Sequence, residues 1–353
     1  MARRETAAAV VRRSSGLSLT AAYPESYNTI RFRHGPPVND VRNRTGLCPM
    51  NIDKIQLARF VKMDDPACVL DEVRVISHRV FPDVDFTPVE EVFADTRRLF
   101  AGEFPGFRGC NTGYHDLKHT TDSFLAMARL MHGAVLQGRP LSRRNMTLGL
   151  VATLLHDAGY MQELDDNTGT GAKYTLTHVQ RSIVFMDSYL AGRGCSREEI
   201  ENCSVMCKCT GLSVKLREIS FSSPEVEMLG KMLGTADLIG QMADRTYLEK
   251  LLILFYEFKE GQVPGYESEF DLLAKSIDFF GFTRKRLDNE LGGVAGYMRH
   301  HFKERWDLDA DMYAITMERN CVYLKHHLEE HPDDYRNYLR RGGYVEQLRG
   351  RNG

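Results

Sequence analysis

Residues 148–160 read LGLVATLLHDAGY, an apolar run that ends in a histidine and an aspartate. Apolar residues three and four positions apart predict a helix, and a helix that is apolar on most of its surface should be buried. A polar pair at the end of a buried helix needs partners for both side chains. Metal ligation satisfies a neutral imidazole and a carboxylate together, so His156 and Asp157 are candidate ligands.

The same spacing of apolar residues recurs along the chain, with glycine or proline between the segments. Alternation with a period of two, which half-buried strands show, is nearly absent. We therefore predict an all-α fold, a multi-helix bundle without an internal repeat. Pro224 suits the first turn of a helix, and residues 165–175 predict a flexible loop. The helical pattern covers residues 89–104, 119–138, 145–160, 177–194, 224–261 and 311–331.

Charge differs between the start of the chain and the remainder. Residues 1–50 hold eight Arg, no Lys and three acidic residues, whereas the remainder holds 38 basic and 45 acidic residues. An acidic remainder argues against a dedicated nucleic-acid surface, because such binding depends on clustered Lys and Arg. We interpret residues 1–49 as a disordered basic extension, with a transit peptide or a start at Met50 as alternatives, and residues 50–345 as one folded domain.

Two further properties bear on where the protein works. No run of about eighteen apolar residues occurs, so we expect no membrane-spanning segment and a cytoplasmic protein. The eight cysteines are scattered, and Cys203, Cys207 and Cys209 form a C-x3-C-x-C pattern that matches no common paired zinc spacing. We interpret them as reduced, partly buried thiols, with a zinc site as the alternative.

Two other segments carry polar residues of the kind that bind metals. The segment GYHDLKHTTD places His115, His119 and Asp122 on one face of a helix, because they lie four and three positions apart. The segment TADL puts Asp237 inside a mostly apolar helix, where an unpaired charge is costly. Each feature alone is commonly structural. Together, in this order and on separate apolar helices, they indicate a metal site.

These segments resemble the signature of the HD-domain metal-dependent phosphohydrolases, and within them the catalytic domain of the class I 3',5'-cyclic nucleotide phosphodiesterases. The family pattern is Tyr-His-Asn-x-x-His-x-x-Asp, then His-Asp, then Ala-Asp-Leu or Ala-Asp-Met. This chain has Tyr114-His115-Asp116-Leu117-Lys118-His119-Thr120-Thr121-Asp122, then His156-Asp157, then Ala236-Asp237-Leu238. The resemblance covers about residues 90–260 of the expected 50–345 catalytic domain.

The resemblance implies a role for each of these residues. His119, His156, Asp157 and Asp237 would bind the first metal, Asp157 would also bridge to a second metal held largely by water, and His115 would be the general acid. Two such cations acidify a shared water molecule that attacks phosphorus, while the acid protonates the departing oxygen. The mixed nitrogen and oxygen set suits Zn at the tighter site and Mg or Mn at the second, and Fe also fits.

Several positions depart from the family pattern or leave two interpretations open. Asp116 stands where the family has Asn, which adds negative charge, and Tyr160 stands where other HD enzymes have Lys. Asp122, or another carboxylate, would orient an imidazole. His178 is either a neighbour of the second metal or a helix N-terminal histidine. Gln241 is an amide near Asp237, but it lies on a different segment from the family's base-selecting glutamine.

Other polar side chains fit a structural role better than a functional one. Lys173 is either a phosphate contact or a solvated lysine, and the second interpretation fits better because the loop matches no P-loop pattern. The His300–His301 and His326–His327 pairs lie beside charged residues, which predicts solvated helix faces. Phe279, Phe280 and Phe282 favour the core over a base pocket.

The leading hypothesis is a metal-dependent phosphohydrolase whose substrate is a small nucleotide or other phosphoester, with a cyclic nucleotide as the first candidate. One alternative keeps the two-metal site but uses iron for oxygenase chemistry. Another is a non-catalytic module that senses a nucleotide. No nucleic-acid or membrane partner is expected, and a homo-oligomer is compatible with the sequence.

Overall fold

The computed structural model describes residues 55–351, and this range is built of helices, with no strand within it. The all-α prediction is therefore confirmed, whereas the expected extension over residues 1–49 lies outside the described residues. No helix in the described range is long and apolar enough to cross a membrane. The α-helices are α2 (Pro66–Val80), α3 (Thr87–Ala101), α4 (Leu117–Leu136), α5 (Arg143–Leu155), α6 (His178–Ala191), α7 (Arg197–Lys208), α8 (Pro224–Met242), α9 (Tyr247–Glu260), α10 (Glu269–Lys285), α11 (Tyr297–Trp306), α12 (Met312–Glu330) and α13 (Tyr344–Arg351).

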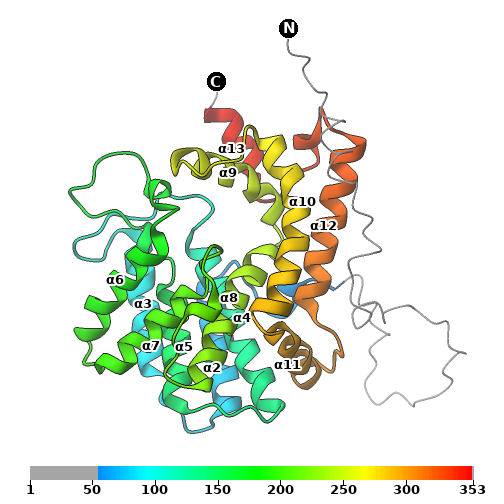
Figure 1. The fold of residues 1–353 in the computed structure, drawn as a ribbon. Coiled ribbons are helices and arrows are strands. Elements are labelled where there is room, and N and C mark those ends of the chain that lie inside the picture. The colour runs from blue at the N-terminus through cyan, green and yellow to red at the C-terminus, as the bar shows by residue number, and fades with distance from the viewer. Residues whose placement is uncertain (1–54, 352–353) are drawn as a thin grey trace, which may run out of the picture.

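Helix α4 lies at the centre of the bundle, and all its residues from His119 to Ala134 are buried. It packs against α8, α2, α11 and α5, so it contacts both flanks of the molecule (Figure 1). The approach of α11 is close: a Cβ atom at Gly133 would lie 1.9 Å from the carbonyl oxygen of Tyr297. Only glycine allows that contact, which fixes α11 against α4.

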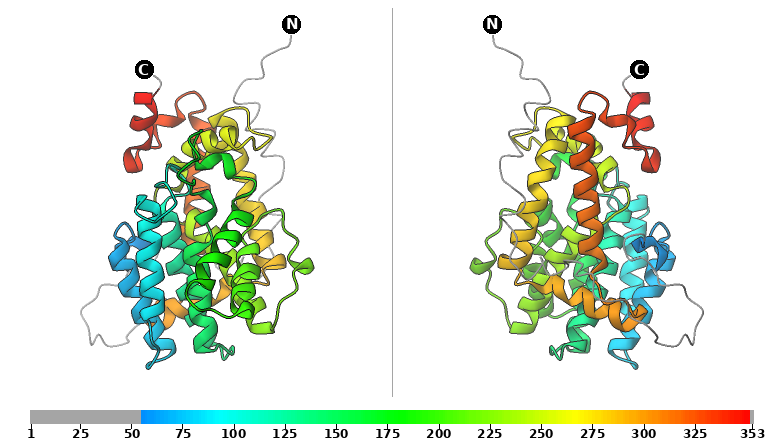
Figure 2. Two further views of the ribbon diagram at one scale, coloured as in Figure 1. Left: turned by 90° about the vertical axis from the view of Figure 1, so that its left-hand side faces the viewer. Right: turned by 90° about the vertical axis from the view of Figure 1, so that its right-hand side faces the viewer.

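The C-terminal helices belong to the same bundle as the motif-bearing helices. Figures 1 and 2 show α10 and α12 side by side on one flank, while α3, α5, α6 and α7 form the other. Leu324 and Leu328 of α12 and Val345 of α13 are buried in the same apolar cluster as the residues of α4 and α8. Residues 260–351 therefore complete the core around the two central helices.

Local details confirm one sequence expectation and revise another. Pro224 is the first residue of α8, and the Ser223 side chain caps that helix by accepting a hydrogen bond from Val226 N at 3.2 Å. The expected flexible loop at 165–175 is instead anchored, because the Glu260 carboxylate accepts hydrogen bonds from the backbone and hydroxyl of Thr170. Its second half, Gly171–Tyr174, forms a 3-10 helix.

The prediction of solvated histidines on α11 is wrong for His301, which is completely buried. It faces α4, where its Nδ1 atom lies 2.9 Å from Nδ1 of His132. The charged neighbours that suggested a solvated face, Arg299 and Lys303, pair with Asp309 and Asp307 at the surface. By contrast, His326 on α12 is exposed, as predicted.

Candidate metal centre

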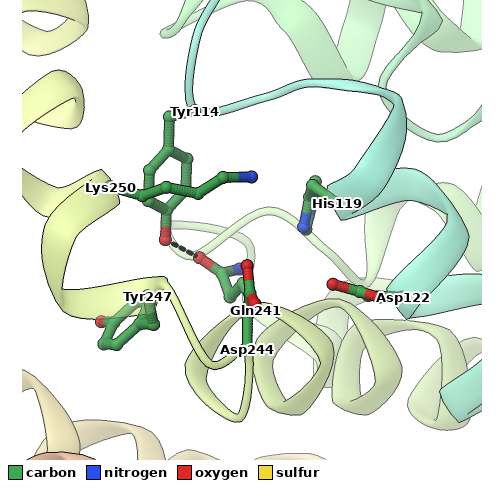
Figure 3. Close-up of a pocket in the computed structure, with 7 residues that line it drawn as sticks. All are labelled: Tyr114, His119, Asp122, Gln241, Asp244, Tyr247 and Lys250. Carbon is green, nitrogen blue, oxygen red and sulfur yellow. Dashed lines mark hydrogen bonds between the residues drawn. The ribbon is translucent and has the colours of Figure 1, made fainter. Parts of the chain in front are cut away.

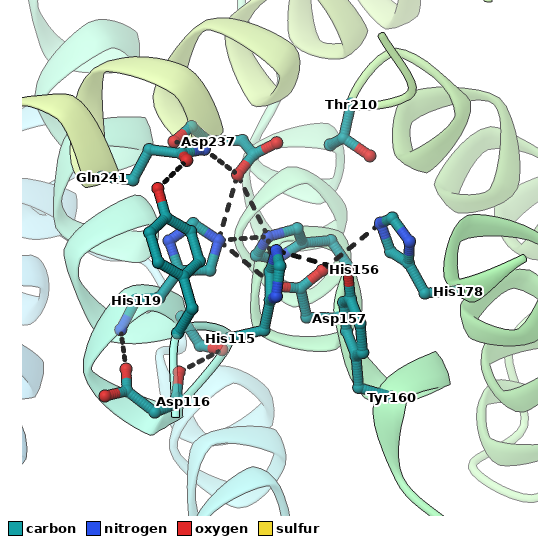
Figure 4. Close-up of polar contacts among 12 residues, drawn as sticks. His115, Asp116, His119, His156, Asp157, Tyr160, His178, Thr210, Asp237 and Gln241 are labelled. Atoms are coloured by element: carbon teal, nitrogen blue, oxygen red, sulfur yellow. Dashed lines mark hydrogen bonds and ion pairs between the residues drawn. The ribbon is translucent and has the colours of Figure 1, made fainter. Parts of the chain in front are cut away.

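The four side chains predicted as metal ligands converge at one point (Figure 4). His119 comes from the first turn of α4, His156 and Asp157 follow the last residue of α5, and Asp237 lies in α8. His119 Nε2 lies 3.2 Å from Asp157 Oδ2, 3.1 Å from Asp237 Oδ1 and 3.4 Å from His156 Nε2. His156 Nε2 lies 3.4 Å from Asp157 Oδ2 and 3.6 Å from Asp237 Oδ1. His119, His156 and Asp157 thus bring donor atoms within 4.8 Å of one another and could hold a divalent cation, and Asp237 Oδ1 lies within 3.6 Å of both imidazoles.

The donor set stands out from the rest of the described chain. Within residues 55–351, His119, His156 and Asp157 form the one group of three or more His, Cys, Asp or Glu residues with donor atoms all within 4.8 Å of one another. Asp157 Oδ2 is also buried and accepts no hydrogen bond there. A buried oxygen of this kind, facing two imidazole nitrogens, fits a metal ligand.

Local hydrogen bonds aim both imidazoles at the centre. His156 Nδ1 lies 2.7 Å from the carbonyl oxygen of Thr153, so Nδ1 carries the proton and Nε2 presents its lone pair. Asp116 caps α4 by accepting a hydrogen bond from His119 N at 2.9 Å. The two oxygens of Asp116 also accept hydrogen bonds from Lys250 Nζ of α9, at 3.0 and 2.9 Å. The negative charge of Asp116, which stands where the phosphohydrolase signature has Asn, is therefore paired with Lys250.

The electrostatics of the centre favour a cation. Burial disfavours the charged form of His119, but the adjacent carboxylates of Asp157 and Asp237 outweigh it and raise the pKa of His119 to about 10. Burial also acts against the charged carboxylates, yet the neighbouring imidazoles hold the pKa values of Asp157 and Asp237 well below their usual range. Without a metal, the centre therefore keeps a proton among these groups. A divalent cation would replace that proton.

Known proteins offer one partial match to this chain. Residues 161–285 match the family described as Npun_R2479-like. That range includes His178 and Asp237 but begins after His119, His156 and Asp157. No curated protein and no solved structure matches the chain.

His115, the predicted general acid, is held by a glutamate that the sequence did not reveal. Its Nδ1 atom lies 2.8 Å from Glu257 Oε2 of α9. The other oxygen of Glu257 accepts hydrogen bonds from the backbone N–H groups of Gly113 and Tyr114, at 2.7 and 2.6 Å. One carboxylate thus fixes both the imidazole and the chain that carries it, and leaves His115 Nε2 directed towards the centre.

The Tyr160 ring packs against the rings of both His115 and His178, whose centroids lie 6.1 Å apart (Figure 4). Its ring centroid is 4.2 Å from that of His115 and 4.5 Å from that of His178, with interplanar angles of 17° and 19°. A Cβ atom at Gly159 would lie 2.0 Å from the carbonyl oxygen of His178, so glycine is required where the turn after Asp157 meets α6. Close contact of this turn with α6 therefore brings His178 to the centre.

His178 faces the second oxygen of Asp157. Its Nδ1 atom lies 2.7 Å from the carbonyl oxygen of Thr175, and its Nε2 atom lies 3.9 Å from Asp157 Oδ1. Burial lowers the pKa of His178, which keeps its imidazole neutral as a ligand must be. His178 is also the first residue of α6, so it is a helix N-terminal histidine that lies beside a candidate ligand, and both interpretations stay open.

Asp122 makes no hydrogen bond to an imidazole within the described chain, but it shares a small cavity with His119 (Figure 3). Lys118 Nζ donates to Asp122 Oδ2 at 2.5 Å. The other oxygen, Oδ1, and His119 Nδ1 are both buried without a hydrogen-bond partner among residues 55–351. The cavity has a volume of about 10 Å³. That is room for about one water between two unsatisfied polar atoms.

Gln241 supports a predicted ligand. Its Nε2 atom donates to Asp237 Oδ1 at 3.3 Å, and its Oε1 atom accepts from Tyr114 OH at 2.6 Å. The amide is therefore committed to positioning Asp237 rather than to reading a base.

The remaining candidates have structural roles. Cys203, Cys207 and Cys209 are buried, and none forms a disulfide. Lys173 Nζ donates to the Thr168 carbonyl at 2.6 Å and pairs with Asp166, so it is neither a phosphate contact nor a freely solvated side chain.

Proposed function

We propose that the chain is a metal-dependent phosphohydrolase that cleaves a nucleotide phosphodiester, with a cyclic nucleotide as the first candidate substrate. The observation that carries the proposal is the position of His115. Its imidazole is held by Glu257 and its ring centroid lies 5.9 Å from that of the candidate ligand His119. A proton donor next to a site with two nitrogen and two oxygen donors meets the needs of phosphoester hydrolysis.

The donor set fits two divalent cations. His119, His156, Asp157 and Asp237 would hold the first. The 3.9 Å between Asp157 Oδ1 and His178 Nε2 is too long for a hydrogen bond. Asp157 and His178 would be the residues that hold a second cation. When bound, the cations would acidify a water molecule and stabilise charge on the phosphoryl oxygens.

The side chains then divide the work of the reaction. The water oxygen forms the new bond to phosphorus, and the bond from phosphorus to the departing oxygen breaks on the opposite side. His115 transfers its Nε2 proton to that oxygen, so the leaving group departs as a hydroxyl. Glu257, 2.8 Å from Nδ1, stabilises the imidazolium before transfer and holds its orientation. Tyr160 OH, 3.3 Å from Nε2, and its stacked ring limit rotation of the imidazole.

A water molecule in the cavity behind His119 completes the support of that ligand. We infer that it accepts a hydrogen bond from His119 Nδ1 and donates one to Asp122 Oδ1. Both buried atoms then gain a partner, and the imidazole is fixed with Nε2 towards the metal. Asp122 would thus act as the predicted orienting carboxylate, through water rather than directly.

The test is hydrolysis by the purified chain supplied with Mn, Mg or Zn. Cyclic AMP, cyclic GMP and bis(4-nitrophenyl) phosphate are the substrates, and we expect turnover that chelation removes. Asp157→Ala should abolish it, while Asp278→Ala, a matched change at an exposed residue of α10, should not. Full turnover by the Asp157→Ala protein would overturn the proposal, as would binding of nucleotide without turnover under every metal, which is the behaviour of a sensing module.

One observation favours a second candidate, a di-iron oxygenase. His178 provides a third imidazole at the centre, which the sequence alone did not establish. An additional histidine suits iron as well as zinc. Metal analysis separates the two: two iron atoms per chain with oxygen consumption favour the oxygenase, and zinc, manganese or magnesium with phosphoester turnover favours the hydrolase.

A further inference from the structure

A second, larger cavity lies on the far side of the turn that joins α8 to α9. Its volume is about 680 Å³, and none of the candidate metal ligands lines it. Its walls come from the segment around η2 (Leu57–Arg59), the turn Ala243–Thr246, helix α12 and residues 341–344. Figure 3 shows one wall residue, Asp244, at this turn. Cavities of about 300–1,000 Å³ are the size of small-molecule sites.

The cavity has an excess of positive charge. Lys118, Arg245, Arg319 and Arg341 line it, against two acidic residues, Asp64 and Asp244. Asp244 is already engaged, because Lys118 Nζ lies 3.3 Å from its Oδ1 and Thr246 donates two hydrogen bonds to it. Lys118 also pairs with Asp122, at 2.5 Å, and Arg319 donates to the carbonyl oxygen of Ile55 at 2.6 Å, so neither is the cation that a ligand would meet first.

Arg245 is the most available of these cations. Its side chain is exposed and forms no hydrogen bond or ion pair with residues 55–351. Arg341 is held in place: its Nη1 donates to the Arg245 carbonyl at 2.6 Å and its Nε lies 3.4 Å from the buried Glu249. A fixed guanidinium and an unpaired one thus line the same cavity, and guanidinium groups bind phosphate or carboxylate well.

Aromatic rings stand beside the cations. Tyr323 and Tyr344 both line the cavity, and the Arg341 guanidinium lies over the Tyr323 ring at 5.2 Å from its centroid. Thr316 and Asn320 add polar groups on α12. Tyrosine rings and arginine planes are surfaces on which a flat heterocycle stacks.

We propose that this cavity is a second ligand site, separate from the metal centre, for a phosphate-bearing molecule with a planar ring, of the size of a nucleoside monophosphate. The guanidinium groups bind the phosphate, and the tyrosine rings contact the heterocycle. The site is independent of phosphoester turnover, since it uses none of the candidate ligands or His115.

The test is calorimetric titration of the full chain with AMP in the presence of EDTA. Adenosine and inorganic phosphate are the separate halves of the probe. We expect one AMP per chain, weaker binding of each half, and unchanged AMP affinity in the Asp157→Ala protein. Arg245→Glu should weaken AMP about tenfold or more, because it replaces a charge-assisted contact with repulsion. Arg217→Glu, a matched reversal of an exposed arginine outside the cavity, should leave the affinity unchanged.

A steric variant gives an independent check. Thr316→Trp should fill part of the cavity and also weaken AMP, without altering phosphoester turnover in the absence of AMP. Absence of AMP binding to the wild-type chain would overturn the proposal. AMP binding that survives both Arg245→Glu and Thr316→Trp, or that is lost in Asp157→Ala, would place the ligand elsewhere and also overturn it.

Discussion

Two pairs of buried histidines lie at opposite ends of helix α4, and their surroundings differ. At its start, His119 and His156 lie 3.4 Å apart and face Asp157 and Asp237. Near its end, His132 and His301 lie 2.9 Å apart, and within residues 55–351 the one carboxylate paired with them is Glu304, at 3.7 Å from His132.

The direction of the pKa shifts follows from this difference. Burial lowers the pKa of His301 well below its ordinary value, and nearby Arg129 adds to the effect. Burial also lowers the pKa of His132, although Glu304 opposes it. The pKa of His119 is raised, because its two carboxylates outweigh burial. Histidine pairing and burial are common to both sites, so the carboxylates are what make one of them a candidate cation site.

The largest expected difference between the two pairs is in metal content. His156→Ala removes a ligand, and we expect the first metal to be lost, with turnover falling on the order of a thousandfold or more. His301→Leu should leave metal content and turnover unchanged, because that pair lacks the carboxylates. Metal analysis of the dialysed proteins gives the answer. Equal metal loss in the two variants would remove the distinction between the pairs.

The next effect concerns proton donation by His115. His115→Gln should slow cyclic nucleotide hydrolysis by about a hundredfold or more, because the departing alkoxide needs a proton. Bis(4-nitrophenyl) phosphate should be much less affected, since nitrophenolate leaves without one. Glu257→Gln should show the same selectivity with a smaller loss. Equal losses on both substrates would indicate a binding or structural role for His115 instead.

The two pairs should also differ in what pH changes: metal affinity at the pair that includes His119, and folding stability at the pair that includes His301. A metal displaces the proton from His119, whose pKa is about 10. Metal affinity should therefore rise by about tenfold per pH unit as pH increases from 7 towards that value. Calorimetry in buffers of different ionisation enthalpy should detect about one proton released per metal at pH 7. A metal affinity that stays constant as pH increases from 7 would contradict the assignment of His119 as a metal ligand.

For the pair near the end of α4, the folded-state pKa of His301 is depressed. It favours folding above the unfolded pKa, and that contribution is lost as pH falls from about 6.5 towards the folded value. The melting temperature of the wild type should drop from pH 8 to pH 5 more steeply than that of His301→Leu. Parallel curves for the two proteins would show that the pair does not contribute.

The smallest expected effect concerns Asp122, which shares the small cavity with His119. Asp122→Asn should weaken metal binding by about ten- to a hundredfold without changing the number of metals bound, because the orienting contact reaches the ligand through water. Competition with a fluorescent chelator measures the affinity. Thr120 lies on the same turn of α4 and is not among the residues that line the cavity. The Thr120→Val protein should therefore bind metal as the wild type does.

The sequence anticipated the parts of this molecule that depend on short patterns. The helical period predicted α4, α5 and α8, and the resemblance to the HD-domain signature implied the four residues that converge. Glu257 could not be found this way, because it lies 142 residues from His115 and its segment reads as an ordinary amphipathic helix. His301 was misjudged because its charged neighbours face the surface while it faces α4. Both depend on packing between distant helices, which local patterns do not encode.

We propose that His119, His156, Asp157 and Asp237 form a metal centre. Anomalous X-ray scattering from crystals of the Zn- or Mn-loaded protein tests it most directly. We expect one anomalous peak at about 2.1 Å from Nε2 of both His119 and His156, and a second between Asp157 and His178. Fully loaded crystals whose peaks all lie away from these four side chains would contradict it.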